Sequence, residues 1–361
     1  MTKKNYISSA NNSIISVVNA IRTGLLENDP ICEYDVFLDV KKLKNKPNNL
    51  WKYKDSFPPL NEEKIVSFFE GFTPLLPILF LGKKIWVKQE QLFSTGSYKD
   101  RGASLVLSHA NSLNIKHVVQ DSSGNAGCAI AAYAALAKMA CDIYVPKDTA
   151  KPKIKQIKTY GAQIHQIDGD REATAKAALR ASKTTYYASH CYNPYFFQGT
   201  KTLAFEICEQ LGWKKPDSVV VPAGNGTLVL GLFLGFYELM NCGIINSLPK
   251  IIAIQAEHCA PLFHQFHQIK GTISFTPTIA EGIAIKKPVR LAQMVDCIQQ
   301  SKGNVIVVSE NDIKKAHQLC GRMGFYIETT SAATIAGLLK YIEETNDETI
   351  VSLFSGHGLK K

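Results

Sequence analysis

The feature that most constrains the fold is a repeated order of short apolar strand, loop and helix, which runs through most of the 361-residue chain. The strands predicted in the first half are 117–120, 141–145, 163–167 and 185–188. The second half repeats the order, from a buried strand at 217–222 to the last strand at 349–353. Alternating strands and helices produce parallel sheets with helices on both faces. The sequence therefore predicts an α/β fold with two doubly wound open-sheet domains.

The same pattern suggests how the chain divides. We expect a larger domain from residues 66–105 and 200–361, and a smaller, substrate-side domain from residues 106–199. Residues 1–65 are polar and are expected to form a lead-in that packs on the larger domain. Within this lead-in, the spacing of apolar residues over 12–25 predicts an amphipathic helix.

Composition excludes several classes of protein. No apolar run is long enough to cross a bilayer, and the N-terminus lacks the apolar core of a signal peptide, so a cytoplasmic protein is expected. The nine cysteines form no Cys-x-x-Cys pair, which argues against a disulfide framework and a metal site. A net charge of +10 is compatible with nucleic-acid binding, but no recognition motif accompanies it. Attraction of anionic cofactors and substrates, or simply a solvated surface, accounts for the charge.

Three glycine-rich loops each follow a predicted strand. They are Ser122–Gly127, Pro222–Thr227 and Phe354–Leu359. In open α/β sheets, ligands bind at the carboxyl ends of strands, and the N–H groups at a helix N-terminus bind phosphate. The segment Gly224–Thr227 suits a phosphate, but it lacks the lysine of a P-loop and the third glycine of a dinucleotide site. Taken alone, this loop is equally compatible with an ordinary strand–helix turn.

Lys99 lies in the segment Ser97-Tyr98-Lys99-Asp100-Arg101-Gly102, just before a predicted helix. A single lysine is usually a solvated side chain. A primary amine is also the group that forms a Schiff base with an aldehyde cofactor. We therefore expect Lys99 to carry such a cofactor and the three loops to hold it.

These four segments resemble, in order and spacing, the fold-type II pyridoxal phosphate enzymes, whose fold is of the tryptophan synthase β type. Two further segments, Glu70–Leu75 and Ser355–Lys360, are similar to segments of threonine synthases. The resemblance covers about residues 66–361. The cysteine pair that some members carry in their lead-in is missing, so no zinc is expected.

The resemblance implies roles for individual residues. Lys99 is the Schiff-base and catalytic lysine, and Asn125 contacts the 3'-oxygen of the pyridoxal 5'-phosphate. Ser355 hydrogen-bonds the ring nitrogen without holding it firmly protonated. The residues expected around the cofactor phosphate are Gly224, Asn225, Gly226 and Thr227. Those expected to bind the substrate are Ser97, Ser122, Ser123, Gly124, Ala126 and Lys153.

The resemblance is uneven where the substrate is concerned. Thr278–Ala284 and the spacing over Pro146–Ala162 look more like threonine/serine dehydratases. Threonine synthases have a Gly-Lys whose lysine meets the substrate phosphate, and this chain lacks it. Lys151 and Lys153 are the candidates for that role. The role of Glu281 is left open. Three features favour the synthase. They are the segment Ser-Gly-His-Gly at 355–358, the end of the chain directly after that segment, and the long lead-in.

The expected activity is that of a threonine synthase-like lyase of threonine biosynthesis, which converts O-phosphohomoserine and water to threonine and phosphate. The alternatives are a threonine or serine dehydratase, another β-replacement enzyme such as a cysteate or cysteine synthase, and an inactive cofactor-binding regulator. The resemblance also implies a homodimer. Neither nucleic acid nor a membrane is an expected partner.

Overall fold

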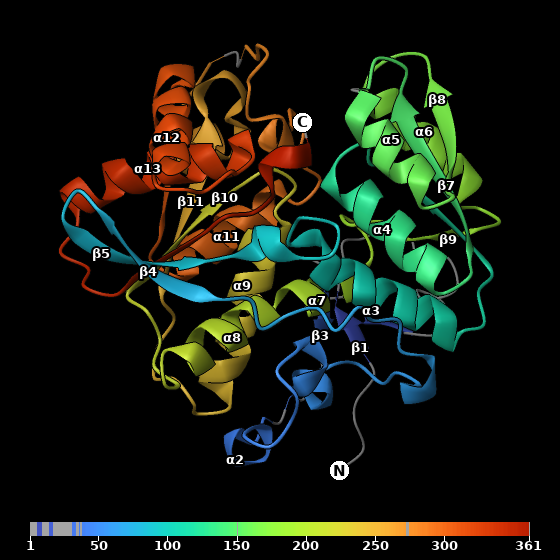
Figure 1. Ribbon diagram of the computed structural model, residues 1–361, viewed down its shortest axis with the longest axis horizontal. Coiled ribbons are helices and arrows are strands. Elements are labelled where there is room, and N and C mark those ends of the chain that lie inside the picture. Colours follow the sequence, from blue (N-terminus) through green and yellow to red (C-terminus); the bar gives the residue numbers. More distant parts are fainter. Residues whose placement is uncertain are drawn as a thin grey trace. The chain divides into compact units, whose positions relative to one another are not determined.

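The computed structural model describes two compact units (Figure 1). Unit 1 comprises residues 1–71 and 99–200, and unit 2 comprises residues 72–98 and 201–360. The residues that it describes are 6–8, 14–16, 31–33, 36, 38–149, 151–271 and 274–360. Both units contain an open, mainly parallel sheet, so the predicted α/β class is confirmed. Among these residues no helix has both the length and the apolar character needed to cross a membrane.

Unit 2 is built on a six-stranded sheet with the order β12-β11-β10-β13-β5-β4. Its strands are β4 (Leu75–Phe80), β5 (Lys83–Lys88), β10 (Ser218–Pro222), β11 (Lys250–Ala256), β12 (Asn304–Val308) and β13 (Ile350–Leu353). All neighbouring pairs are parallel except β4 and β5, which form an antiparallel hairpin. The central strand β10 is fully buried, as a run of apolar residues in a parallel sheet requires.

The helices of unit 2 cover both faces of this sheet. They are α8 (Thr202–Gln210), α9 (Thr227–Asn241), α10 (Pro261–Phe266), α11 (Leu291–Gln300), α12 (Glu310–Arg322) and α13 (Thr329–Glu344). The chain moves outward from β10 to β12 through α9 and α11, then returns through α13 to β13 on the other side of β10. Because crossovers are right-handed, reversing direction places α13 on the opposite face from α9 and α11 (Figure 1).

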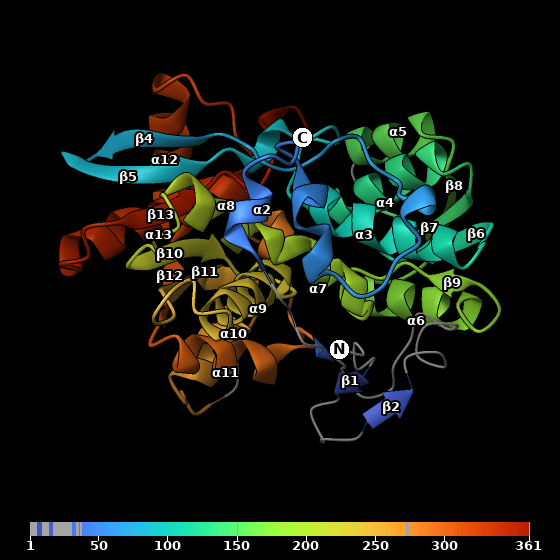
Figure 2. The same cartoon turned by 90° about the horizontal axis from the view of Figure 1, so that it is seen from below.

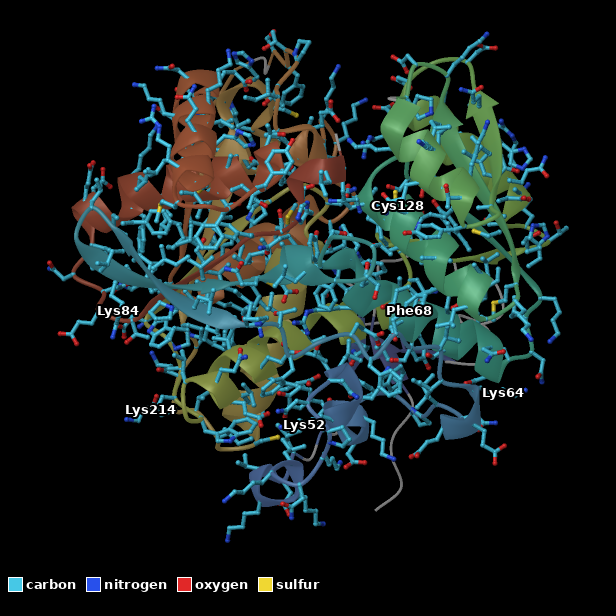
Figure 3. The ribbon with its side chains drawn as sticks, viewed as in Figure 1. Lys52, Lys64, Phe68, Lys84, Cys128 and Lys214 are labelled. Atoms are coloured by element: carbon cyan, nitrogen blue, oxygen red, sulfur yellow. The ribbon has the colours of Figure 1, made fainter. Side chains whose placement is uncertain are left out.

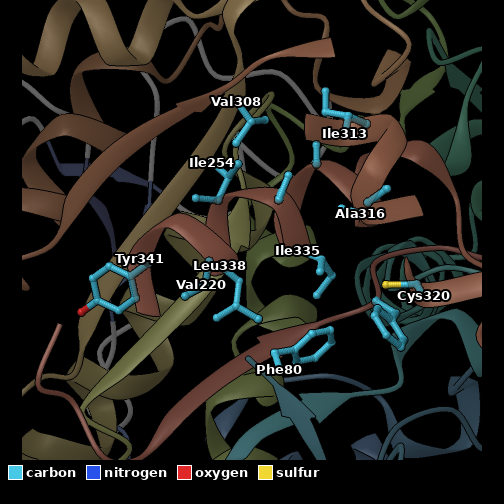
Figure 4. Close-up of a cluster of buried hydrophobic side chains, with 14 of the residues drawn as sticks. Phe80, Val220, Ile254, Val308, Ile313, Ala316, Cys320, Ile335, Leu338 and Tyr341 are labelled. Atoms are coloured by element: carbon cyan, nitrogen blue, oxygen red, sulfur yellow. The ribbon is translucent and has the colours of Figure 1, made fainter. Parts of the chain in front are cut away.

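The main core of unit 2 lies between the sheet and α13 (Figure 4). Val220, Ile254 and Val308, from three neighbouring strands, face Ile335 and Leu338 of the helix. The helix approaches closely because position 337 is glycine. A Cβ there would lie 2.3 Å from Cδ1 of Ile254.

Unit 1 contains a parallel sheet with the order β8-β7-β6-β9 (Figure 2). The strands are β6 (His117–Gln120), β7 (Ala140–Pro146), β8 (Gln163–Ile167) and β9 (Tyr186–Tyr187). The helices are α3 (Lys99–Ser112), α4 (Asn125–Leu136), α5 (Lys151–Thr159), α6 (Arg171–Ala181) and α7 (Pro194–Thr200). A short helix, α2, spans Val40–Leu43, and a small antiparallel sheet has the order β2-β1-β3.

The unit with which the lead-in groups differs from the expectation. It groups with unit 1 instead of the larger unit, because residues just before 71 hydrogen-bond to α3. The N–H of Val66 donates to Oγ of Ser108 at 2.8 Å, and Asn111 donates to the carbonyl of Lys64 at 2.9 Å. Helix α3 therefore also groups with unit 1, and the unit boundaries fall at 71, 98 and 200.

The prediction of a helix over 12–25 is wrong for those of its residues that the structure describes. Ile14–Ser16 form β2, which pairs antiparallel with β1 (Tyr6–Ser8), and β1 pairs with β3 (Ile31–Glu33). The remainder of the predicted helix lies outside the described residues.

A buried ion pair supports the carboxyl end of β5. Nζ of Lys88 lies 2.8 Å from Oε2 of Glu206, and both side chains are fully buried. The same ammonium group donates to the carbonyl of Thr73 at 2.6 Å and to Oε1 of Gln210 at 2.8 Å. Three acceptors therefore satisfy its three protons.

We predict that Lys88→Met destabilises the protein by about 3–5 kcal/mol, because it leaves the carboxylate of Glu206 buried without its counter-charge. The free energy of unfolding in urea measures the effect. Lys84→Met on the same strand is the matched control, since Lys84 is exposed (Figure 3). Equal losses in the two variants would contradict this assignment.

Candidate active site

The sheet of unit 2 has a topological switch point between β10 and β13. From β10 the chain continues to one side through β11 and β12, whereas β13 joins β10 on the other side. The two strands pair in parallel, with Val220 opposite Ser352, so the loops that follow them leave the same edge of the sheet. Ligands of open α/β sheets bind at such a point. Here it is flanked by the segments Gly224–Thr227 and Ser355–Gly358.

The loop after β10 forms a cradle in which two glycines are closely packed. Gly226 has a φ of 86° and precedes the first residue of α9. A Cβ on Gly226 would lie 2.8 Å from Sδ of Met294, and one on Gly224 would lie 3.1 Å from the carbonyl oxygen of Gly282. No described residue accepts a hydrogen bond from the N–H of Gly224 or Gly226. These donors at a helix N-terminus fit a phosphate group.

The segment after β13 presents a buried hydroxyl. Ser355 is fully buried, and its Oγ donates to Oε1 of Glu328 at 2.8 Å. Oγ of Ser331, also fully buried, lies 3.0 Å from Oγ of Ser355. Ser331 is in the first turn of α13, and Glu328 immediately precedes that helix.

Residues 95–98 run beside this segment. The N–H of Tyr98 donates to the carbonyl of Ser355 at 3.1 Å, and the N–H of His357 donates to the carbonyl of Gly96 at 2.9 Å. The hydroxyl of Tyr98 lies 2.7 Å from Oγ1 of Thr227, the last residue of the glycine cradle. Tyr98 is therefore bonded to both loops of the switch point.

Lys99 is the next residue in the chain. Its Cα lies about 3.8 Å from that of Tyr98, as any trans peptide requires. It is also the first residue of α3 in unit 1, where its Nζ lies 5.5 Å from the ring centroid of Phe196. Gly102, one turn along, lets α3 approach that ring, since a Cβ there would lie 2.4 Å from it.

His190 also packs on Phe196, with 6.1 Å between the ring centroids. It follows β9 by three residues and is buried. Burial, followed by the positive charges of Lys99 and Arg171, holds the pKa of His190 well below its usual value. The imidazole is therefore neutral at physiological pH.

The loop after β6 lies at the switch point of unit 1, because β6 stands between β7 and β9. Ser122 is buried, and its Oγ accepts a hydrogen bond from the N–H of Gly124 at 3.2 Å. Gly127 lets α4 start directly beneath this loop, since a Cβ there would lie 1.9 Å from the carbonyl oxygen of Ser122. Ser123 is half-buried, and Asn125 and Ala126 are the first two residues of α4.

The structure brings most of the predicted residues together within each unit. In unit 2, Ser97, Gly224–Thr227 and Ser355 are joined through Tyr98. In unit 1, Lys99 opens α3 and Ser122–Ala126 leads into α4, which packs against α3.

The lysines proposed for a substrate phosphate belong to a different element, α5 of unit 1. Lys153 is half-buried on α5, away from these loops in the sequence. A surface cavity of 790 Å³ beside α5 is lined by Lys147, Lys155 and Lys158, and Lys153 is not among its lining residues. The side chain of Lys151 lies outside the described residues.

Four residues of these networks were not predicted. Tyr98 lies inside the lysine motif, between two residues to which the motif assigns roles. Glu328, Ser331 and His190 belong to no motif in the sequence. Only the pairing of strands far apart in the chain brings them beside Ser355 and Lys99.

The donor set fits pyridoxal phosphate. Gly224 and Gly226 offer N–H groups that no described residue accepts, and Ser355 offers a buried hydroxyl. Oγ of Ser97 is fully buried and meets no hydrogen-bond partner among the described residues. Because buried polar atoms are nearly always paired, this hydroxyl fits contact with a polar ligand.

Comparison with known proteins agrees with this fit. The chain is 37% identical over 354 residues to a threonine synthase of Methanocaldococcus jannaschii, covering 93% of this chain and 87% of that relative. It is 34% identical to a threonine synthase of Methanosarcina acetivorans, covering 93% and 86%. A solved threonine deaminase of Solanum lycopersicum shares the fold, with a TM-score of 0.70 and 22% identity over 87% of each chain.

Residues 66–356 match the family described as pyridoxal-phosphate dependent enzyme. The predicted resemblance to fold-type II enzymes, the cofactor and the lyase class are thereby confirmed. The chain belongs to the family of pyridoxal-phosphate dependent enzymes.

Proposed function

We propose that this lyase converts O-phosphohomoserine and water to threonine and phosphate. The observation that carries the proposal is the position of Tyr98, which is bonded to both Thr227 and Ser355 and is followed directly by Lys99. The identity to threonine synthases over nearly the whole chain supports this activity over others of the family.

The cofactor contacts follow from the donors of each loop. The N–H groups of Gly224–Gly226 and the hydroxyl of Thr227 bind the cofactor phosphate, and Ser355 contacts the ring nitrogen. Lys99 provides the covalent link, and the amide of Asn125 donates to the 3'-oxygen. Bound pyridoxal phosphate supplies a ring that takes up the negative charge formed on the substrate.

The substrate contacts come from the loop after β6. Ser122, Ser123 and the N–H groups of Gly124–Ala126 bind the substrate carboxylate, because a helix N-terminus favours a negative charge. Ser97 binds a polar group of the substrate, which gives its buried hydroxyl a partner. Lys153 is the proposed contact for the substrate phosphate.

The amine of Lys99 moves the protons of the reaction. It removes one proton from Cα and one from Cβ, phosphate leaves from Cγ, and a proton is delivered to Cγ, which becomes the methyl group. Water then adds its hydroxyl group at Cβ and a proton returns to Cα, which gives threonine. The neutral imidazole of His190, which packs on the same Phe196 ring as Lys99, adds no second positive charge beside this amine.

A threonine or serine dehydratase is the second candidate. The dehydratase-like segment Thr278–Ala284 lies directly against the glycine cradle, with the carbonyl of Gly282 3.1 Å from where a Cβ on Gly224 would stand. The segment therefore belongs to the wall of the proposed phosphate site. Glu281 itself is exposed.

One comparison separates the two activities. We predict that protein loaded with pyridoxal phosphate releases phosphate from O-phosphohomoserine faster than it forms a keto acid from threonine or serine. Lys99→Ala lowers this rate at least about 100-fold, the usual contribution of a general acid–base group. Lys147→Ala, at an exposed lysine of unit 1, is the control and retains the rate. Keto-acid formation without phosphate release would assign the dehydratase activity instead.

A second copy of the chain is the proposed macromolecular partner. Strand β4 is the outermost described strand of the sheet in unit 2. It exposes Leu76 by 40% and Leu79 by 66%, and Leu81 in the adjoining turn is exposed by 66%. Outer strands with exposed apolar side chains favour association.

We expect light scattering to give the mass of a dimer. Leu79→Lys on β4 shifts the protein toward monomer, because two such charges would face an apolar interface. Leu319→Lys, on the exposed side of α12, leaves the mass unchanged. A monomeric wild-type protein would rule out the dimer.

A further inference from the structure

Gln255 is a fully buried glutamine of β11, the strand beside β10 in the sheet of unit 2. Its side-chain amide makes two hydrogen bonds. Nε2 donates to the carbonyl of Ala223 at 3.1 Å, and Oε1 accepts from the N–H of Phe263 at 3.0 Å. Ala223 is itself fully buried and joins β10 to the glycine cradle, whereas Phe263 lies in the first turn of α10.

The two partners fix the direction in which this amide faces. A backbone N–H only donates and a carbonyl oxygen only accepts, so Oε1 has to face Phe263 and Nε2 has to face Ala223. The N–H of Phe263 is one of those at the start of α10 that no helical carbonyl accepts, and Ala260 offers that helix no side-chain cap. Gln255 therefore satisfies a helix N-terminus and a loop carbonyl with one side chain.

The carbonyl of Ala223 belongs to the same peptide group as the N–H of Gly224. No cis peptide bond occurs among the described residues, and in a trans peptide these two groups point in opposite directions. Because the carbonyl faces Gln255, the N–H of Gly224 faces away from that side chain. The N–H of Ala223 is held as well, since it donates to the carbonyl of Ile254 at 2.9 Å.

The loop by itself does not select this orientation. Glycine accepts a wider range of backbone angles than other residues, so Gly224 leaves the plane of the preceding peptide free to turn. No described residue accepts a hydrogen bond from its N–H, so nothing described holds the peptide from that side. A flipped peptide would turn the carbonyl of Ala223, instead of a donor, toward a bound phosphate. The hydrogen bond from Gln255 opposes that flip.

We propose that Gln255 is a positioning residue for the phosphate of pyridoxal phosphate. By holding the carbonyl of Ala223, it aims the N–H of Gly224 into the glycine cradle before the cofactor binds. The inference rests on the proposed contact between Gly224 and the cofactor phosphate. Gln255 acts through this peptide group and not by touching the phosphate itself. A donor that is already oriented costs no rearrangement when the ligand binds.

The preference for pyridoxal phosphate over pyridoxal tests the proposal without measuring activity. Pyridoxal has the same ring and aldehyde but no phosphate, so the ratio of the two dissociation constants reports the phosphate contacts alone. Both constants are measured on the cofactor-free full-length protein by absorbance of the bound ring. We expect Gln255→Met to lower the preference for pyridoxal phosphate at least about 10-fold, because a hydrogen bond to a charged group is lost.

Gln120→Met is the matched control. Gln120 is also fully buried, accepts from the N–H of Asp121 at 2.7 Å and donates to the carbonyl of Ala188 at 2.8 Å. It is the last residue of β6 in unit 1 and bonds no residue of the glycine cradle. Its preference is expected to equal that of the wild type. Equal preferences in the wild type and Gln255→Met would overturn the proposal.

Gln255→Glu carries the test if Gln255→Met does not fold. A protonated carboxyl group at this position donates to Ala223 and accepts from Phe263, as the amide does, whereas an ionised one cannot donate. Burial raises the pKa of a carboxyl group, which brings this change into a usable pH range. We expect the wild-type preference at low pH and a weaker one as the pH rises, each compared with the wild type at the same pH. A preference that stays constant relative to the wild type would contradict the role of Gln255.

The same measurements separate this inference from the proposed function. A wild-type protein that binds pyridoxal as tightly as pyridoxal phosphate would overturn the proposed phosphate site and this inference with it. A wild-type protein that prefers pyridoxal phosphate, with the same preference in Gln255→Met, would overturn only the role of Gln255.

Discussion

The site depends on two hydrogen bonds made by one residue. Tyr98 donates its N–H to the carbonyl of Ser355 and places its hydroxyl 2.7 Å from that of Thr227. These bonds hold together the two loops at the switch point of the sheet in unit 2. Because Lys99 is covalently joined to Tyr98, the same bonds fix where the backbone of the proposed Schiff-base lysine begins. The geometry of the proposed cofactor site thus follows from strand order and a single tyrosine.

Around this point, close backbone approaches replace side-chain contacts. Gly224 and Gly226 keep the proposed phosphate cradle free of side chains, and Gly356 leaves room for the carboxylate of Glu328. In unit 1, Gly102 and Gly127 play the same part for α3 and for the loop after β6. Each of these glycines lies in or next to a segment that was recognised as a motif. The physical reason for the motifs is therefore steric as much as chemical.

The sequence was sufficient to locate most strands of both sheets. Apolar runs bounded by turn residues marked β6 and β8 to the residue, and β10 and β13 to within one residue. These strands are short, buried and locally encoded, so their own pattern is enough to find them.

What the sequence did not reveal depends on contacts between distant residues. The apolar residues over 12–25 have a helical spacing, yet strand pairing decides the conformation of Ile14–Ser16. The lead-in groups with unit 1 because Asn111 bonds to the carbonyl of Lys64, a contact that spans 47 residues. The partnership of Glu328 and Ser355 spans 27 residues and has no signature in either segment. The loops of the site were predictable as motifs, but the residues that orient them were not.

The central claim is that Lys99 carries pyridoxal phosphate. Reduction of the loaded protein with borohydride fixes the cofactor covalently to whichever lysine holds it, and mass spectrometry of the digested protein then identifies that residue. The account predicts a single phosphopyridoxyl group, on the peptide that contains Ser97, Tyr98 and Lys99. A modified lysine at any other position, or no modification of the loaded protein, would contradict it.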